Sequence, residues 1–386
     1  MRWSILLVCA VLSACASQPS AQSRPDHLFN DAVFQASSTP VDTDVFALSE
    51  AMRRFLHSEI DPQLRRKGRL EGLIDALQNR AQLKLEFDSA VTRTAAEAFD
   101  LRAGNCISLV VMTAALAREL GLLVYYQRVY ADETWSRDGN ILFRSGHVNL
   151  ILRQRPGDMS DMMNMSSDRS EQITVDFLPP EDVRGYRTRP IEERTVIAMF
   201  MNNRAAESLA RGQLDDAYWW VREAIAHDSG LLNAYNTLGV VYRRHGNLGE
   251  AERVYRLLLE REPDSPTVIS NLAAVLTTAG QLEAAQALLQ QLHRIEPYPP
   301  FYFLDQAQVA LKRGDFRAAI DLFSQELARD PFYHAAHFGL AVAYLQLGDF
   351  ASAREHLTAA MENSTTRRDH ELYAAKLDRL RSYQVR

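Results

Sequence analysis

The sequence predicts an α+β domain followed by an all-α solenoid of repeated helix pairs. In the first half, a helical apolar run at 109–120 precedes strand-like segments rich in β-branched and aromatic residues between 122 and 178. In the second half, small residues recur every 34 residues between about 198 and 365. A fixed period of this length indicates helix pairs that bury a core by stacking on their neighbours.

The composition is that of a globular protein. With 386 residues the chain is long enough for two or three domains, and 47% of its residues are hydrophobic. The net charge is −6 at pH 7, which predicts no basic surface for nucleic acid. We therefore expect no nucleic-acid partner.

Residues 1–15 have the features of a bacterial targeting segment. Arg2 supplies a positive charge, and Ile5 to Val11 form an apolar core that is too short to cross a membrane as a mature helix. The segment ends in Leu-Ser-Ala-Cys, which resembles the lipobox of bacterial lipoproteins, whose cysteine is lipid-modified. The resemblance implies that Cys15 carries a lipid anchor. The alternative is an ordinary signal peptide with a chance cysteine.

The residues after Cys15 predict a tether and a location. Small polar residues begin the segment 16–40, for which we expect a flexible tether. Ala16 stands where an aspartate would, in many Gram-negative bacteria, resemble an inner-membrane retention signal. The sequence therefore predicts a protein lipid-anchored in the cell envelope, at the outer membrane and facing the periplasm, with no other membrane contact.

Helices are expected between the tether and the centre of the first domain. Val41 to Ile60 show helical periodicity, with Asp42 or Asp44 as the N-cap. A second helix is expected at 61–78, because Pro62 suits the first helical position. The next expected elements are a short strand at 84–87 and a helix at 92–101.

One cysteine stands where a reactive thiol is expected. Cys106 follows a Gly-Asn pair and begins the apolar helix, which Gly121 ends as a C′ glycine. At a helix N-terminus, unpaired N–H groups and the macrodipole favour thiolate over thiol. His147 and Asp176 follow in strand-like runs, and adjacent antiparallel strands could set the imidazole against the carboxylate. Cys, His and Asp in this order are typical of an activated cysteine nucleophile.

Residues 95–179 resemble the transglutaminase-like superfamily, a branch of the papain-like cysteine enzymes. The matching blocks are RAGNCISLVVMTAALARELGL, GHVNLIL and VDFLP. The resemblance implies an α+β papain/transglutaminase-like domain, which we place at 41–190. It further implies that Cys106 is the nucleophile, His147 the base and Asp176 the residue that orients His147. Members of this family transfer or hydrolyse acyl groups at amide bonds, and some have lost activity.

The number of cysteines supports a functional thiol. Of the three cysteines, Cys9 would be removed with the targeting segment and Cys15 would be acylated, which leaves Cys106 without a disulfide partner. A free thiol in an oxidising compartment is a liability unless it is buried or used. The alternative to a catalytic thiol is a small buried core cysteine.

Several further features leave alternatives open. Gln127, in an expected strand at 122–130, is either a donor to the oxyanion or an outward-facing polar residue. Trp135, in an expected polar loop, either lines the substrate groove or packs on the domain. Asn149 shares a strand face with His147, and we expect it to be a structural hydrogen-bonding residue.

No metal or cofactor is expected. Methionines cluster in the sequence MSDMMNM at 159–165, which either binds Cu(I) or belongs to a long polar loop at 153–171, the interpretation we favour. His334 and His337 could form a weak metal pair, but nothing in the sequence completes it. No other group of side chains has convincing metal-ligand spacing, and no phosphate-binding glycine loop is present.

A periodic pattern begins after the prolines at 179–190, which we interpret as the exit from the first domain. Alanines stand 34 residues apart at Ala217, Ala251, Ala285, Ala319 and Ala353. The pattern resembles tetratricopeptide repeats, five of which we place at 198–365, followed by a polar capping helix within 366–386. The first repeat is degenerate, because Arg204 and Ser208 occupy positions that are usually apolar or aromatic.

Together these features predict a periplasmic, transglutaminase-like cysteine enzyme that acts on an amide bond of a protein or peptide. Hydrolysis is favoured over acyl transfer because a periplasmic site is open to water, and location alone suggests the peptide stems of the cell wall as substrate. Stacked repeats form a groove that commonly takes a peptide or helix, so we expect the repeats to bind a protein. The alternative is a non-catalytic scaffolding or assembly lipoprotein that acts through its repeats.

Overall fold

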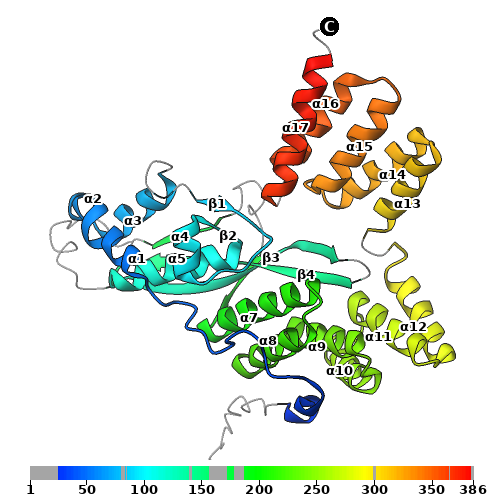
Figure 1. Ribbon diagram of the computed structural model, residues 1–386, viewed down its shortest axis with the longest axis horizontal. Helices are drawn as coiled ribbons and strands as arrows, with labels where there is room; N and C mark the ends of the chain where they lie inside the picture. Colours follow the sequence, from blue (N-terminus) through cyan, green and yellow to red (C-terminus); the bar gives the residue numbers. More distant parts are fainter. Residues whose placement is uncertain are drawn as a thin grey trace, which may run out of the picture.

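The computed structural model describes residues 25–79, 83, 85–138, 141–155, 172–177, 187–298, 301–364 and 366–383. The predicted targeting segment, Cys15, and the methionines of 159–165 lie outside these residues. A mixed α/β region forms the N-terminal part, and helix pairs lead from it to the C-terminus (Figure 1).

The α/β region combines short helices, one long helix and a sheet. Its helices are α1 (Glu50–Arg54), the π-helical turn η3 (Phe55–Glu59), α2 (Asp61–Lys67), α3 (Arg69–Gln78), α4 (Ala95–Leu101) and α5 (Cys106–Glu119). Its strands are β1 (Glu86–Phe87), β2 (Ala103–Gly104), β3 (Leu123–Asp138), β4 (Ile141–Arg153), β5 (Gln172–Val175) and β6 (Arg187–Ile191).

The main sheet is antiparallel and has the strand order β5-β4-β3-β6. The long helix α5 packs against β3 and β4, and eleven of its residues are buried. Val148, Leu150 and Leu152 of β4 are fully buried. Because side chains alternate along a strand, His147, Asn149 and Ile151 share the opposite face of β4. Strands β1 and β2 form a separate parallel pair directly before α5.

The first helix starts later than the periodicity predicts. The segment 41–49 is not helical, and Ser49 rather than Asp42 or Asp44 caps α1 by accepting the N–H of Met52 at 3.3 Å. The carboxylate of Asp44 instead accepts the N–H of Phe46 at 3.0 Å. Such local side-chain bonds to the backbone compete with helix formation. The predicted N-cap and the first half of this helix are therefore wrong.

Two further element predictions need correction. The helix expected at 61–78 is two helices, because Gly68 adopts a left-handed φ of +89° between α2 and α3. Trp135 does not lie in a loop, since its backbone pairs with Arg144 in the extended β3–β4 ladder. The expected exit from the first domain also contains β6, which adds a fourth strand beside β3.

Five helix pairs follow β6. They are α7 (Glu193–Ala210) with α8 (Leu214–His227), α9 (Leu232–His245) with α10 (Leu248–Arg261), α11 (Pro266–Thr278) with α12 (Leu282–Ile295), α13 (Tyr302–Arg313) with α14 (Phe316–Arg329), and α15 (His334–Gln346) with α16 (Phe350–Glu362). Helix α17 (Arg367–Tyr383) packs on α16, where a capping helix is predicted. The first pair begins at residue 193, earlier than the predicted 198.

Small residues let the two helices of a pair approach closely. In the second pair, a Cβ at Gly239 of α9 would lie 2.5 Å from the Cζ of Tyr255 in α10. Tyr255 is fully buried, so its ring cannot move aside into solvent. Gly339 of α15 meets Phe323 of α14 in the same way, at 2.3 Å, across the contact between neighbouring pairs.

The N-terminal residues are packed along the first two helix pairs. We call residues 26–38 the N-terminal strap; it contains the 3-10 turns η1 (Asp26–Leu28) and η2 (Asp31–Val33). The ring of Phe34 stacks on Tyr218 at a centroid distance of 3.9 Å. The backbone N–H of Asn30 lies 3.1 Å from the hydroxyl of Tyr218 and 2.9 Å from that of Tyr242.

Charged residues of α8 hold the rest of the strap. Asp216 accepts the N–H of Ser38 at 2.6 Å and its hydroxyl at 2.7 Å. Arg222 donates to the carboxylate of Asp31 at 3.0 Å. The prediction of a flexible tether at 16–40 is therefore wrong for the strap, because aromatic burial and specific hydrogen bonds order it. One hydrophobic core runs from Leu28 through the α/β region to α12.

Across the part of the chain that the structure describes, no helix combines the length and the apolar character needed to cross a bilayer.

Two glycines of the second pair provide a test of this packing. Gly239→Ala should lower the free energy of unfolding by about 1–3 kcal/mol, because the new Cβ overlaps the Tyr255 ring. Gly249→Ala, in the partner helix α10, meets nothing within 4 Å and should change stability by less than about 1 kcal/mol. Urea unfolding followed by circular dichroism measures both. Equal effects of the two substitutions would contradict the close approach of α9 and α10.

Candidate active site

The N-terminus of α5 is fixed by the side chain that precedes it. Asn105 is the N-cap, and its Oδ1 accepts the backbone N–H of Ser108 at 3.0 Å and the Ser108 hydroxyl at 2.8 Å. These bonds do not use the backbone N–H of Cys106 or Ile107, which belong to the first turn. Cys106 is half-buried at the first helical position, so its thiol lies at the positive end of the helix dipole.

Packing requires the glycine two residues before the thiol. A Cβ at Gly104 would lie 2.6 Å from the Cβ of Ser108. The carbonyl of Gly104 also accepts the N–H of Asp88 at 3.0 Å, which continues the β1–β2 ladder. A larger residue would push this loop away from α5. Both residues before Cys106 therefore have a structural role: Gly104 allows the close approach to Ser108, and Asn105 caps α5.

His147 and Asp176 lie on neighbouring strands and share a short hydrogen bond. His147 is on β4, and Asp176 directly follows β5, which pairs antiparallel with β4. The Nε2 of His147 and the Oδ1 of Asp176 are 2.7 Å apart, and the two side chains are only 8% and 13% exposed. The structure therefore brings this pair together as the strand pattern predicts, in a site where little water competes for the bond.

A buried amide holds the other oxygen of the carboxylate. Nδ2 of Asn149 donates to Oδ2 of Asp176 at 2.9 Å, and Asn149 is 5% exposed. Because His147 and Asn149 bind different oxygens, the carboxylate of Asp176 has one orientation. The structural role expected for Asn149 is confirmed, and its partner is Asp176.

The electrostatics of His147 favour its protonated form. Burial of the ring disfavours the charge, but hydrogen bonds with Asp176 and with Cys106 outweigh this effect and raise the pKa of His147 to about 9. Since Nε2 binds Asp176, Nδ1 is the nitrogen left for Cys106. An imidazolium held between a carboxylate and a sulfur atom can stabilise a thiolate and later supply a proton.

The structure gives limited information on the other two predicted site residues. In the β3–β4 ladder, Gln127 lies opposite Asn149, and Val129 lies opposite His147. Gln127 therefore shares the strand face of the histidine, but it is displaced from it by two residue pairs along the ladder. The side chain of Trp135 lies outside the described residues, so its role in a groove stays a prediction.

The described side chains include no group of three or more His, Cys, Asp or Glu residues placed to hold a metal ion. In the last repeat, Nδ1 of His337 lies 3.1 Å from Nδ1 of His356, and His334 instead contacts the hydroxyl of Tyr373 at 2.9 Å. The predicted pairing of His334 with His337 is thus replaced by contacts of each residue with another helix.

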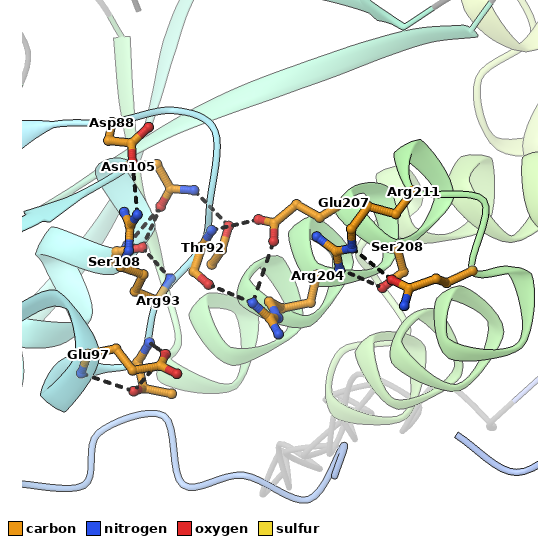
Figure 2. A network of polar contacts seen from close by, with 12 residues as sticks. Asp88, Thr92, Arg93, Glu97, Asn105, Ser108, Arg204, Glu207, Ser208 and Arg211 are labelled. Atoms are coloured by element: carbon orange, nitrogen blue, oxygen red, sulfur yellow. Dashed lines mark hydrogen bonds and ion pairs between the residues drawn. The ribbon is translucent and has the colours of Figure 1, made fainter. Parts of the chain in front are cut away.

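A polar network that the sequence did not predict joins α5 to α7 (Figure 2). The side chain of Asn105 donates to the hydroxyl of Thr92, and the backbone N–H of Thr92 donates to Glu207. Arg204 donates to the carbonyl of Thr92 at 3.1 Å. The sequence does contain a signal for this network, since Arg204 is one of the residues that make the first repeat degenerate.

Comparison with known proteins identifies the helix pairs. Family models of the tetratricopeptide repeat match residues 242–299 and 304–366. The C-terminal half of the chain therefore consists of tetratricopeptide repeats, and α7–α16 form their helical array. A comparison with curated proteins finds no match.

Several solved structures are similar to the repeat half. MamA is 18% identical, covering 45% of this chain and 93% of MamA, with a TM-score of 0.26. Yeast Tom70 is 17% identical, covering 48% of this chain and 40% of Tom70, with a TM-score of 0.34. YrrB, described as a tetratricopeptide-repeat protein with an unusual peptide-binding site, is 22% identical, covering 47% of this chain and 92% of YrrB, with a TM-score of 0.25.

Substitutions of Asn149 test how the Asp176 carboxylate is held. Asn149→Ala should cost about 2 kcal/mol of stability, because a buried charged acceptor loses a donor. At pH 7, Asn149→Asp should lower the free energy of unfolding more than Asn149→Ala does, because two buried carboxylates then face each other. At pH 5, the loss caused by Asn149→Asp should be smaller than at pH 7. Burial and the like charge raise the pKa of the new acid above its unfolded value, so its stabilising protonated form is lost as pH rises.

Urea unfolding at the two pH values measures these differences. Thr174→Ala, at an exposed position of β5 two residues before Asp176, is the matched control and should have little effect at either pH. A pH-independent loss in Asn149→Asp would contradict the contact with Asp176.

Proposed function

We propose that the α/β region is a transglutaminase-like cysteine enzyme domain with Cys106 as its nucleophile. The observation that carries the proposal is the position of His147, which is hydrogen-bonded to Asp176 and lies close enough to Cys106 for the two groups to interact electrostatically. Cysteine nucleophiles are recognised by this geometry rather than by sequence position, because the base must reach the thiol and must itself be oriented.

The proposed reaction begins with attack of the Cys106 sulfur on the carbonyl carbon of an amide. The carbonyl oxygen takes up the electron pair, and the backbone N–H of Cys106 at the helix N-terminus can donate to it. As the tetrahedral intermediate collapses, the C–N bond breaks and His147 gives its proton to the leaving amine. Gln127 is a further candidate donor to the oxyanion from its place on the same strand face as His147.

Water completes the proposed reaction. Neutral His147 removes a proton from a water molecule, and the resulting hydroxide attacks the thioester carbonyl. The S–C bond then breaks, which releases the acid and restores the sulfur beside the protonated imidazole. Asp176 stays ionised throughout and stabilises the imidazolium, with Asn149 holding its orientation. An amine acceptor in place of water would give acyl transfer by the same steps.

The proposed location and substrate follow from the N-terminal sequence. With Cys15 lipid-modified, the enzyme would be anchored at the outer membrane and act in the periplasm. The peptide stems of the cell wall are the substrate class that this location suggests, and hydrolysis is favoured because water is abundant there. Trp135 is the candidate residue for the wall of the substrate groove.

The repeats are proposed to bind a protein partner or the substrate protein. Tetratricopeptide arrays commonly accept a peptide or helix along stacked helices. In this chain the strap already covers parts of α8, α9 and α10. We therefore expect the partner to contact the later pairs, α11–α16, unless it displaces the strap.

A second candidate function is that of a scaffolding lipoprotein without catalysis. The repeats favour it, because protein binding alone would explain half of the chain. The intact arrangement of Cys106, His147 and Asp176 favours the enzyme, since a relic has no need to keep all three groups in contact.

The rate of alkylation of Cys106 by iodoacetamide between pH 4 and 9 separates the two functions. In the enzyme, the rate should stay high well below the ordinary thiol pKa of about 8.5 and should collapse in His147→Ala. Mass spectrometry of the peptide that contains Cys106 measures the rate in the full chain. Asp369→Ala, which removes the hydrogen bond that Asp369 of helix α17 accepts from the Thr366 hydroxyl, is the control and should leave the rate unchanged.

A slow rate that rises only near pH 8.5 and does not respond to His147→Ala would exclude the enzyme. In that case the scaffolding function would remain, and loss of partner binding on removal of α13–α16 would be its test.

A further inference from the structure

A chain of hydrogen bonds runs from the first tetratricopeptide repeat to the N-cap of α5 (Figure 2). Oε1 of Glu207, on α7, accepts the backbone N–H of Thr92 at 2.6 Å. The Thr92 hydroxyl accepts a hydrogen bond from Nδ2 of Asn105 at 2.7 Å. Oδ1 of Asn105 in turn caps α5 directly beside Cys106.

The position of Thr92 sets the direction of these hydrogen bonds. Glu207 holds the backbone N–H of Thr92, so the hydroxyl of the same residue has a fixed place beside Asn105. Because the oxygen of this hydroxyl accepts the hydrogen bond from Asn105, the Nδ2 of the amide is oriented toward Thr92. Oδ1 is thereby directed to the backbone N–H of Ser108, which is the orientation that an N-cap needs.

Burial makes this orientation costly to change. Thr92 is fully buried, Asn105 is 8% exposed and the Glu207 side chain is 13% exposed. Water therefore cannot readily replace a lost partner in the chain. A flipped Asn105 amide would place its NH₂ group against the N–H of Ser108 and would lose the cap.

Two arginines support the ends of this hydrogen-bond network, one beside Glu207 and one beside Ser108. Arg204 donates to the Thr92 carbonyl at 3.1 Å and lies 3.6 Å from Oε2 of Glu207. On the other side, the backbone N–H of Arg93 donates to the Ser108 hydroxyl at 2.8 Å, and its guanidinium pairs with Asp88 at 2.9 Å.

The charge on Glu207 is balanced between two opposing effects. Burial raises the pKa of Glu207, and the hydrogen bonds from Thr92 together with the positive charges of Arg204 and Arg211 oppose this increase. Glu207 thus keeps its accepting role through specific partners from both the α/β region and α7.

We propose that Glu207 is a positioning residue for Cys106, acting through Thr92 and Asn105, so that the first tetratricopeptide repeat completes the active site. This inference rests on the proposed function, because a position matters only if the thiol reacts. It implies that the α/β region cannot be separated from α7 without loss of reactivity. The repeats then contribute to the chemistry as well as to partner binding.

Paired substitutions at Thr92 test the chain in the full-length protein. Thr92→Val keeps the backbone N–H but removes the hydroxyl, and it should lower the rate of Cys106 alkylation at pH 7 by up to about 100-fold. Thr92→Ser restores a hydroxyl and should recover most of the wild-type rate. Glu207→Gln replaces one accepting oxygen of the carboxylate by an NH₂ group, which faces the N–H of Thr92 or the guanidinium of Arg204. This substitution should also lower the alkylation rate.

A matched control separates positioning from general stability. Thr195→Val also removes a partly buried hydrogen bond of α7, from the Thr195 hydroxyl to Asp228 at 2.6 Å, but it does not touch the hydrogen bonds that lead to Asn105. It should lower the thermal midpoint without changing the alkylation rate of the folded protein. Hydrogen exchange at the Ser108 N–H should become faster in Thr92→Val and Glu207→Gln, and not in Thr195→Val.

The possible failures are distinguishable. If wild-type Cys106 reacts fast and depends on His147, but Thr92→Val and Glu207→Gln react at the wild-type rate, the positioning role is overturned and the enzyme stands. If the wild-type thiol reacts slowly and does not depend on His147, the proposed function is overturned and the positioning role with it. A loss of rate in Thr195→Val equal to that in Thr92→Val also overturns the positioning role.

Discussion

The bond on which the site depends is the N-cap that Asn105 makes to α5. Its Oδ1 binds Ser108, and this fixes where the helix starts and hence where the sulfur of Cys106 lies. Eleven residues of this helix are buried, and the helix packs against the sheet that carries His147 as well as against α4 and α7. Because α5 is held so tightly along its length, its first residue can be placed accurately against the imidazole. Gly104 contributes by allowing the preceding strand to approach Ser108.

Packing and hydrogen bonds join the two halves of the protein. A single hydrophobic core extends from the strap through the α/β region to α12, and the Glu207–Thr92–Asn105 chain crosses the same boundary. The strap adds a second connection, because these N-terminal residues pack against α8–α10.

Sequence analysis predicted the elements that rest on local patterns. The apolar period predicted α5, the fixed spacing predicted the repeats, and alternation in two strands predicted that His147 and Asp176 meet. It failed where the partner is distant in sequence. Nothing near Thr92 indicates a bond to a residue 115 positions away, and nothing near Phe34 indicates that it stacks on Tyr218. The break at Gly68 was missed because a helical pattern continues on both sides of it.

The central claim is that Cys106, His147 and Asp176 act as one unit, and titration of the His147 ring by NMR tests it most directly. The pKa of His147 should be about 9 in the wild-type chain and should move toward the ordinary value of about 6.5 in both Asp176→Asn and Cys106→Ser. A His147 that titrates near 6.5 in the wild-type chain, with no change in either variant, would contradict the account.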